Sequence, residues 1–279
     1  MQDQEAILKI ENMNKRFGKG CSHCQDSQDQ LVNNFCPHCG TVYACRNINL
    51  ELYPGEILGI VGESGSGKST LMQSLYFDQD VTSGTYLLKA YKEGQANLYE
   101  ANIYEQKKIR NNLLGMVYQN PILGLRMDYS SIANIAEKMI AAGNRNVESM
   151  KARGKELLEK VDISPLRAKE APKNFSGGMQ QRVQIAKALS NKPPILLLDE
   201  VTTGLDLSVQ ADVLDLIKTI QRDLKISMII VSHDLAVIRM LADRTIVMHK
   251  GVIIEEGLTD QILEDPQDAY TQQLVYSLI

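Results

Sequence analysis

The chain of 279 residues has no cysteine beyond residue 45 and no apolar run long enough to cross a membrane. Its apolar runs, such as ILLL at 195–198 and MIIV at 228–231, are far shorter than the roughly 20 residues of a membrane helix. The start, MQDQEAILKI, lacks the basic segment and apolar stretch of a secretory signal. These absences exclude a direct membrane span and lead us to expect a cytoplasmic protein.

Excess positive charge is also missing, because 30 Lys and Arg face 34 Asp and Glu, for a net charge of −4. Sequence-independent binding to nucleic acid depends on many Lys and Arg contacts to phosphate, so no nucleic-acid partner is expected. A hydrophobic content of 44% is ordinary for a soluble globular protein with a real core.

Strand-like and helix-like patterns alternate along the chain. AILKIENM at 6–13 predicts an edge strand, and CRNINLELY at 45–53 alternates with Ile48, Leu50 and Leu52 on one face. The segment at 19–44 between them is therefore expected to form the tip of a hairpin.

Further strands are expected at 56–62, 195–199, 227–232 and 244–250, with helical patterns between them. This order predicts an α/β fold with a mainly parallel sheet covered on both faces. Residues 100–192 carry helical periodicity and few strand signals, and we expect a helical subdomain there, within a single domain over 1–279.

GESGSGKS at 62–69 matches the phosphate-binding pattern GxxxxGK(S/T) and lies between a strand and a helix, as its mechanism requires. The glycines let backbone N–H groups point at a β-phosphate, Lys68 supplies a cation, and the Ser69 hydroxyl can ligate Mg2+. The loop residues expected to bind ATP are Gly62, Ser64, Gly65, Ser66, Gly67, Lys68, Ser69 and Thr70.

Two further stretches fit the same chemistry. ILLLDE at 195–200 brings Asp199 toward Mg2+ and lets Glu200 polarise a water for attack on the γ-phosphate. In FSGGMQQR at 175–182, paired glycines open a helix and face free N–H groups toward an anion. Each stretch alone is also compatible with an ordinary turn.

Together these motifs resemble those of the ATP-binding cassette (ABC) ATPases, whose signature is SGGxQ, over nearly the whole chain outside the cysteine segment. The resemblance implies that Gln119 in VYQNP links Mg2+ and water to the helical subdomain, and that His233 in VSHD faces the γ-phosphate. It also implies that Phe17 stacks on adenine. Further nucleotide-binding residues that it implies are Ser176, Gly177, Gly178, Gln180 and, in the D-loop, Asp206.

The family's mechanism, carried over to these positions, makes Glu200, His233 and Gln119 the catalytic residues and Ser69, Gln119 and Asp199 the Mg2+ ligands. Two ATP molecules would lie between two head-to-tail cassettes, so the chain would need a second copy or a homologue as its partner. The family usually reads DEPT where this chain reads DEVT. Val201 lacks the φ restraint of proline, and we expect a looser turn with no catalytic group lost.

The variable segments resemble the ATP-binding subunit of the bacterial carbon-phosphorus lyase system. GLR at 124–126 and GLTDQILEDP at 257–266 carry this similarity. It implies a dimer that docks on the soluble carbon-phosphorus lyase core complex and uses ATP to open or remodel it.

One alternative function stays open, and another is disfavoured. The ending YTQQL is shared with oligopeptide-type cassettes, which favours the ATPase subunit of an oligopeptide- or nickel-type importer. A DNA-repair cassette with a zinc module is disfavoured, because residues 21–39 contain Asp26 and Asp29 but no Lys or Arg.

Cys21, Cys24, Cys36 and Cys39 form two CxxC pairs. Two such pairs make a tetrahedral site with four sulfur ligands, and a loop with few apolar side chains needs a metal to become ordered. Structural Zn2+ is the expected ion, with a single iron or an iron–sulfur cluster as alternatives. A reducing compartment disfavours disulfides.

The neighbouring residues have separate expectations. Gly40, after the second pair, should adopt the positive φ of the turn. His23 and His38 should face solvent, although a site with one histidine replacing a cysteine stays open, and Cys45 should be a buried strand residue. We expect the segment beside the adenine end of the ATP site, as a contact surface for a partner or a brace for the nucleotide-binding edge.

Overall fold

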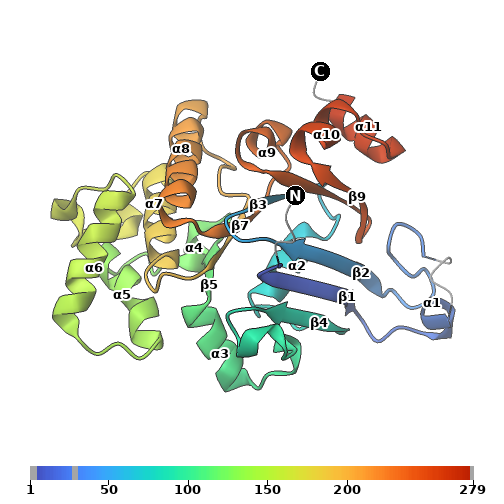
Figure 1. Cartoon of the computed structure of the whole chain (residues 1–279), viewed down its shortest axis with the longest axis horizontal. Coiled ribbons are helices and arrows are strands. Elements are labelled where there is room, and N and C mark those ends of the chain that lie inside the picture. The colour runs from blue at the N-terminus through green and yellow to red at the C-terminus, as the bar shows by residue number, and fades with distance from the viewer. Residues whose placement is uncertain (1–4, 27–30, 277–279) are drawn as a thin grey trace. The chain divides into compact units, whose positions relative to one another are not determined.

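The structure of the protein is a computed structural model that describes residues 5–26 and 31–276 (Figure 1). The chain divides into two compact units, which we describe separately. The first unit comprises residues 1–101 and 231–279, and the second comprises residues 102–230. The division predicted from the sequence, with an inserted hairpin at 19–44 and a helical subdomain at 100–192, stays a prediction.

The first unit contains a three-stranded antiparallel sheet. Strand β1 (Leu8–Phe17) lies between β2 (Val42–Leu52) and β4 (Ser83–Leu88). The expectation of an edge strand at 6–13 is therefore wrong, because β4 pairs with the second side of β1. Ile48, Leu50 and Leu52 are buried on one face of β2, as their alternation predicts.

A second group of strands in this unit contains β3, the strand that precedes the glycine loop. Strand β3 (Ile57–Val61) is buried along its whole length and pairs in parallel with β8 (Arg244–His249), and β8 pairs antiparallel with β9 (Val252–Leu258). The helices of this unit are α1 (Ser22–Asp26), α2 (Lys68–Leu75), α9 (Leu235–Leu241), α10 (Thr259–Glu264) and α11 (Ala269–Tyr276).

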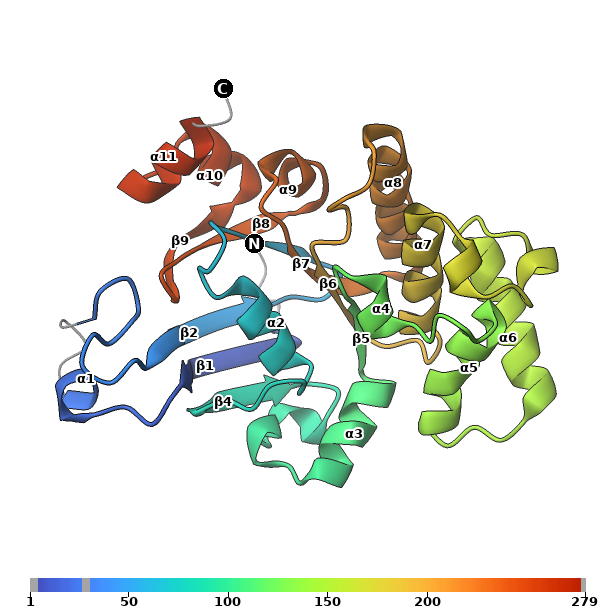
Figure 2. The ribbon, with the colours of Figure 1, turned by 180° about the vertical axis from the view of Figure 1, so that it is seen from behind.

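The second unit places helices around three strands (Figure 2). Strand β6 (Ile195–Asp199) lies between β5 (Leu114–Val117), with which it pairs in parallel, and β7 (Ser227–Val231). Strand β5 has four residues, too few for a pattern to reveal. The helices are α3 (Ile103–Asn112), α4 (Pro121–Gly124), α5 (Ser131–Ala141), α6 (Val147–Lys160), α7 (Gly177–Ala188) and α8 (Leu207–Leu224).

Short 3-10 helices lie at Lys92–Gly94, Leu98–Glu100, Pro165–Arg167 and Pro172–Asn174. Parallel strands alternating with helices confirm the predicted α/β class. Within residues 5–26 and 31–276, no helix combines the length and the apolar character needed to cross a membrane.

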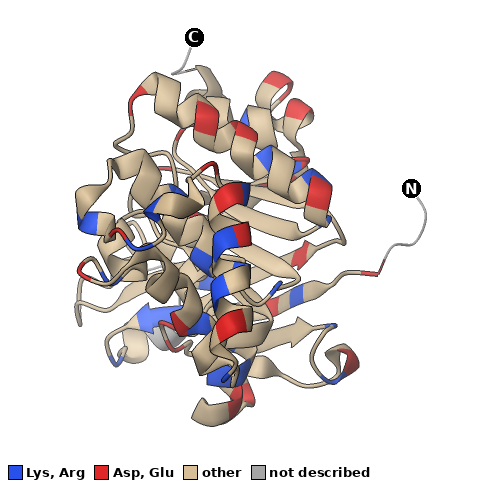
Figure 3. Cartoon of the chain, turned by 90° about the vertical axis from the view of Figure 1, so that its left-hand side faces the viewer, with Lys and Arg blue, Asp and Glu red and all other residues tan. Residues whose placement is uncertain are grey.

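Charges of both signs alternate along the helices that face the viewer in Figure 3. On α6, Lys151 pairs with Glu148 and Arg153 pairs with Glu156, each three residues apart. Helical pairs with this spacing contribute only a few tenths of a kcal/mol each. They describe a solvated helix surface with mixed charge.

Candidate functional site

The glycine loop after β3 leaves no room for side chains at two of its positions. Gly62 has a φ of +148°, and a Cβ there would lie 2.1 Å from the carbonyl oxygen of Met248 in β8. Gly67 has a φ of +107°, and its Cβ would lie 2.2 Å from the carbonyl oxygen of Ala44 in β2. The backbones of two strands therefore fix the shape of the loop, and only glycine fits at either position.

Lys68 begins α2 and is buried in the loop that it follows. Its Nζ donates hydrogen bonds to the carbonyl oxygens of Gly62 and Glu63 at 2.7 and 2.8 Å, and to Ser66 Oγ at 3.3 Å. The rest of the predicted loop differs in exposure: Ser64, Gly65 and Ser69 are exposed, Ser66 is buried, and Thr70 is half-buried. The structure thus holds the predicted cation against the loop, with an exposed backbone segment beside it.

Two other predicted residues lie in the first unit. Phe17 ends β1 with 43% of its surface exposed, and Lys15 Nζ lies 4.8 Å from the centre of its ring. His233 is exposed, one residue before the Asp234 cap of α9, whose Oδ1 accepts from the Ala236 N–H at 2.8 Å. Both side chains are accessible to a ligand.

In the second unit, the structure brings Gln119 and Glu200 together. Gln119 Nε2 donates to Glu200 Oε2 at 2.9 Å, and Thr203 Oγ1 lies 3.3 Å from the same oxygen. Glu200 has a φ of +46°, a left-handed conformation that is costly for a residue with a side chain, and it follows the buried Asp199 at the end of β6. An oriented carboxylate of this kind can accept a proton from a water.

The predicted signature residues start α7. Ser176 caps the helix, with Oγ accepting from the Met179 N–H at 3.4 Å, and Gln180 Nε2 donates to the Phe175 carbonyl at 3.0 Å. Gly177 is the first helical residue, and a Cβ on Gly178 would lie 2.3 Å from Val209 Cγ1 of α8. The start of α7 therefore packs directly against α8.

Asp206, in the same unit, is the N-cap residue of α8. Its Oδ1 accepts from the Val209 N–H at 3.1 Å, so it caps α8. A carboxylate at this position also complements the positive end of the helix dipole.

Two buried glutamines of α7, absent from the sequence prediction, hold the main chain next to Gln119. Gln184 Oε1 accepts from the Tyr118 N–H at 2.6 Å, and its Nε2 donates to the Tyr118 carbonyl at 3.0 Å. Gln181 Nε2 donates to the same carbonyl at 3.4 Å. The signal in the sequence is that the two glutamines lie three residues apart, on the same side of the helix.

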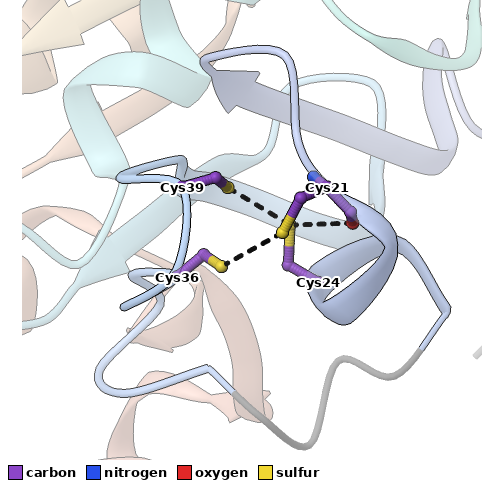
Figure 4. Close-up of side chains that lie close together, drawn as sticks. All are labelled: Cys21, Cys24, Cys36 and Cys39. Atoms are coloured by element: carbon purple, nitrogen blue, oxygen red, sulfur yellow. Dashed lines mark hydrogen bonds between the residues drawn. The ribbon is translucent and has the colours of Figure 1, made fainter.

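The four cysteines of the CxxC pairs converge on one point (Figure 4). The Sγ atoms of Cys21 and Cys24 are 3.8 Å apart, those of Cys21 and Cys36 are 3.8 Å apart, and those of Cys24 and Cys39 are 3.7 Å apart. A tetrahedral ion with Zn–S bonds of about 2.3 Å requires an edge of about 3.8 Å. The separations are too long for disulfide bonds, and all five cysteines are free thiols. The donor set therefore fits one tetrahedral ion.

Hydrogen bonds shape both turns. The Cys21 N–H donates to Cys24 Sγ at 3.2 Å, and Gly40 adopts the predicted positive φ, +72°. Hydrogen bonding between Cys39 and the side chain and backbone of Thr41 lowers the pKa of Cys39 to about 6, which favours the thiolate that binds metals.

The structure agrees with the predictions for the two histidines and for Cys45. His23 and His38 are exposed and stack on each other, with ring centres 4.2 Å apart, so the described ligand set consists of thiols alone. Cys45 is fully buried, and burial raises its pKa to about 12. Asp29 lies outside the described residues.

The cysteine segment lies beside the glycine loop within the first unit. Tyr43 of β2 packs with Cys24 and Cys36, and its hydroxyl donates to the Cys24 carbonyl at 3.0 Å. Asn33 and Asn34 line a cavity of about 710 Å³ whose other walls include Glu63–Gly65. The same short stretch of β2 therefore contacts the thiol cluster through Tyr43 and the glycine loop through Ala44.

Comparison with known proteins agrees with this architecture. The profile of the ABC transporter family matches residues 45–203, more than half of the chain. A dimeric ATP-binding cassette, in a post-hydrolysis state with ADP and Pi, superposes with a TM-score of 0.74 and 28% identity, over 90% of this chain and 98% of its own. The chain therefore belongs to the ABC transporter family and is an ABC-type ATPase.

Two relatives of known type are similar to this chain over most of its length. The phosphonates utilization ATP-binding protein PhnK of Escherichia coli (strain K12) is 42% identical over 84% of this chain and 90% of its own length. The oligopeptide transport ATP-binding protein OppD of Bacillus subtilis (strain 168) is 38% identical over 89% of this chain and 70% of its own length. The predicted family is confirmed, and the identity to a phosphonates utilization protein confirms the predicted similarity to a phosphonate-related cassette.

Proposed function

We propose that this chain is the ATP-binding and ATP-hydrolysing subunit of a phosphonate carbon-phosphorus lyase system. The observation that carries the proposal is the 42% identity to PhnK over 90% of that protein's length. In this role the cassette would dock on a soluble lyase core complex. It would use ATP binding and hydrolysis to open or remodel that core.

The proposed nucleotide site takes its residues from the motifs that the chain shares with the ABC ATPases. The Gly62–Thr70 loop and Lys68 would hold the phosphates, Phe17 would stack on adenine, and Ser69, Asp199 and Gln119 would hold Mg2+. Bound Mg2+ would neutralise charge on the β- and γ-phosphate oxygens. The hydrogen bond from Gln119 to Glu200 supports the assignment of Glu200 as general base, because it orients the carboxylate before a water arrives.

We further propose that two cassettes act as a pair. A second copy or a homologue would supply Ser176, Gly177 and Gly178 to the phosphates bound by Lys68 and Ser69, with Gln180 and Asp206 nearby. The dimeric state of the cassette structure that resembles this chain supports the pairing. His233 would stabilise charge on the transferring phosphoryl group.

A second candidate function is the ATPase subunit of an oligopeptide importer. The 38% identity to OppD favours it, because this value is only slightly below the identity to PhnK. The two functions differ in the partner, which is a soluble enzyme complex in one case and a polytopic permease in the other.

An affinity purification tests the partner directly. The tagged chain would be recovered from its host grown with a phosphonate as sole phosphorus source, after mild detergent has solubilised the membranes. Copurification of soluble subunits that release the hydrocarbon from a phosphonate is expected. Recovery of an integral membrane permease, with no such subunits, would overturn the lyase assignment in favour of the importer. Cells grown on inorganic phosphate and cells with an untagged chain provide the background.

We propose Zn2+ as the ion of the four-cysteine site and the surrounding segment as a contact surface. The sulfur separations support a single ion rather than a multi-iron cluster, whose ligands would bind different irons. Val32 and Phe35 are exposed apolar side chains of this segment, and the stacked His23 and His38 lie on its surface. Elemental analysis of the purified protein distinguishes zinc from iron, and visible absorbance would reveal a cluster.

A further inference from the structure

A tyrosine of the C-terminal helix holds the same peptide group that Lys68 holds. The peptide between Gly62 and Glu63 presents its carbonyl oxygen to Lys68 Nζ at 2.7 Å. The N–H of the same peptide, on Glu63, donates to Tyr270 Oη at 2.9 Å. Groups from two distant segments therefore fix both polar ends of one peptide plane in the phosphate loop.

Tyr270 is itself held in place from two sides. Its ring packs on His249 of β8, with ring centres 3.9 Å apart, and His249 Nδ1 lies 3.2 Å from Glu63 Oε1. The segment before α11 is fixed to β9, because the two Glu255 carboxylate oxygens accept from the N–H groups of Gln267 and Asp268 at 2.7 and 3.0 Å. The tyrosine hydroxyl is thus presented to the loop by a fixed support.

We propose that Tyr270 is a positioning residue for Lys68, acting through the Gly62–Glu63 peptide. The inference rests on the proposed role of Lys68 at the phosphates. A phosphate oxygen that competes for the Lys68 ammonium weakens the bonds to the loop carbonyls, and the Tyr270 hydrogen bond then keeps the peptide from rotating. The loop therefore stays in its binding shape before and after the ligand arrives, and less ordering is needed on binding.

Tyr270→Phe tests the proposal, because it removes the hydroxyl and keeps the ring on His249. We expect the Kd for MgATP to rise about fivefold, as for the loss of one hydrogen bond in the loop. Calorimetric titration of the purified full chain with MgATP gives the Kd. Tyr276→Phe is the matched control, because Tyr276 lies on the same helix with 63% of its surface exposed, and its Kd should match that of the wild type. Equal affinities of Tyr270→Phe and Tyr276→Phe would overturn the proposal.

A double-mutant cycle separates positioning from a structural effect. In a Lys68→Ala background, Tyr270→Phe should change the Kd less than twofold, because the group that it positions is gone. The same fivefold factor in both backgrounds would overturn the link to Lys68. His249→Gln removes the ring that packs on Tyr270, and we expect it to raise the Kd for MgATP about twofold. A wild-type chain that fails to bind MgATP would contradict the proposed function itself, and the role of Tyr270 would fall with it.

Discussion

The phosphate loop and the four-cysteine segment are both short, glycine-containing stretches, but they obtain their shape from different sources. In the loop, the backbones of β2 and β8 approach so closely that Gly62 and Gly67 leave no space for a Cβ. At Gly40 in the cysteine segment, a Cβ would meet no atom within 4 Å. The loop is therefore shaped by packing, whereas we expect the segment to depend on the ion proposed for its four thiols.

The largest expected effect is on the rate of ATP hydrolysis, and it should leave the phosphate loop and the cysteine segment unchanged. Glu200→Gln keeps the size of the side chain but removes the base, so kcat for ATP hydrolysis should fall by about 100- to 10,000-fold. The Kd for MgATP and the metal content should stay as in the wild type. A phosphate-release assay measures kcat, and Glu159→Gln on the exposed face of α6 is the control. A fall of less than tenfold would contradict the role of Glu200.

Glycine substitutions test whether packing shapes the loop. Gly67→Ala places a methyl group against the Ala44 carbonyl, and we expect the affinity for MgATP to fall by more than about 100-fold, with the metal retained. Gly65→Ala has the same left-handed strain in open space, so its loss should stay below about tenfold. Gly143→Ala, in a turn of the second unit with φ of +98° and open space, controls for the strain alone.

These affinities are measured by equilibrium titration with MgATP. Similar losses for Gly67→Ala and Gly65→Ala would show that the backbone angle, and not the contact with β2, limits the loop.

Removal of two cysteine ligands tests whether the four-cysteine segment depends on a metal. Cys36→Ser with Cys39→Ser should release the metal, because two thiols cannot hold an ion that needs four ligands. Elemental analysis should find no bound zinc, and partner binding or ATP hydrolysis should decrease. Cys45→Ala should retain the metal, because Cys45 lies outside the cluster. Metal loss with unchanged hydrolysis and partner binding would refute a contact role for the segment.

The smallest expected effect concerns the fifth cysteine. Burial raises the pKa of Cys45 to about 12, so only about one thiol in ten thousand is ionised at pH 8. After the metal is removed by a chelator, iodoacetamide at pH 8 should therefore add to four cysteines and leave Cys45 unmodified. Mass spectrometry counts the adducts, and unfolding in guanidinium should raise the count to five. Labelling of Cys45 in the folded chain would show that the strand behind the loop opens readily.

The sequence predicts the parts of this molecule whose signals are local. The phosphate-loop pattern, with Gly62, Gly67 and Lys68, and the two CxxC pairs can each be recognised from a few neighbouring residues. In the structure the loop lies between β3 and α2, and the four thiols of the CxxC pairs lie together. Local patterns do not predict β4 or the central position of β1, because the residues of β1 and β4 that pair lie far apart in the chain.

The same limit applies to the supporting residues of the site. Gln184 reaches Tyr118 across 66 positions, and Tyr270 reaches Glu63 across 207. Gln184 lies outside the quoted motifs, and the YTQQL stretch that contains Tyr270 does not indicate a contact with Glu63. Only the fold reveals which backbone group each side chain holds. Long-range side-chain contacts to the main chain are thus what sequence patterns miss here.

The hydrogen bonds of Lys68 have one more consequence, for discrimination among anions. An incoming ligand must offer the ammonium more than the Gly62 and Glu63 carbonyls already provide. A triphosphate brings several charged oxygens and meets this requirement, whereas chloride or a single phosphate gains less from the exchange. We therefore expect the loop to favour a triphosphate over the small anions around it.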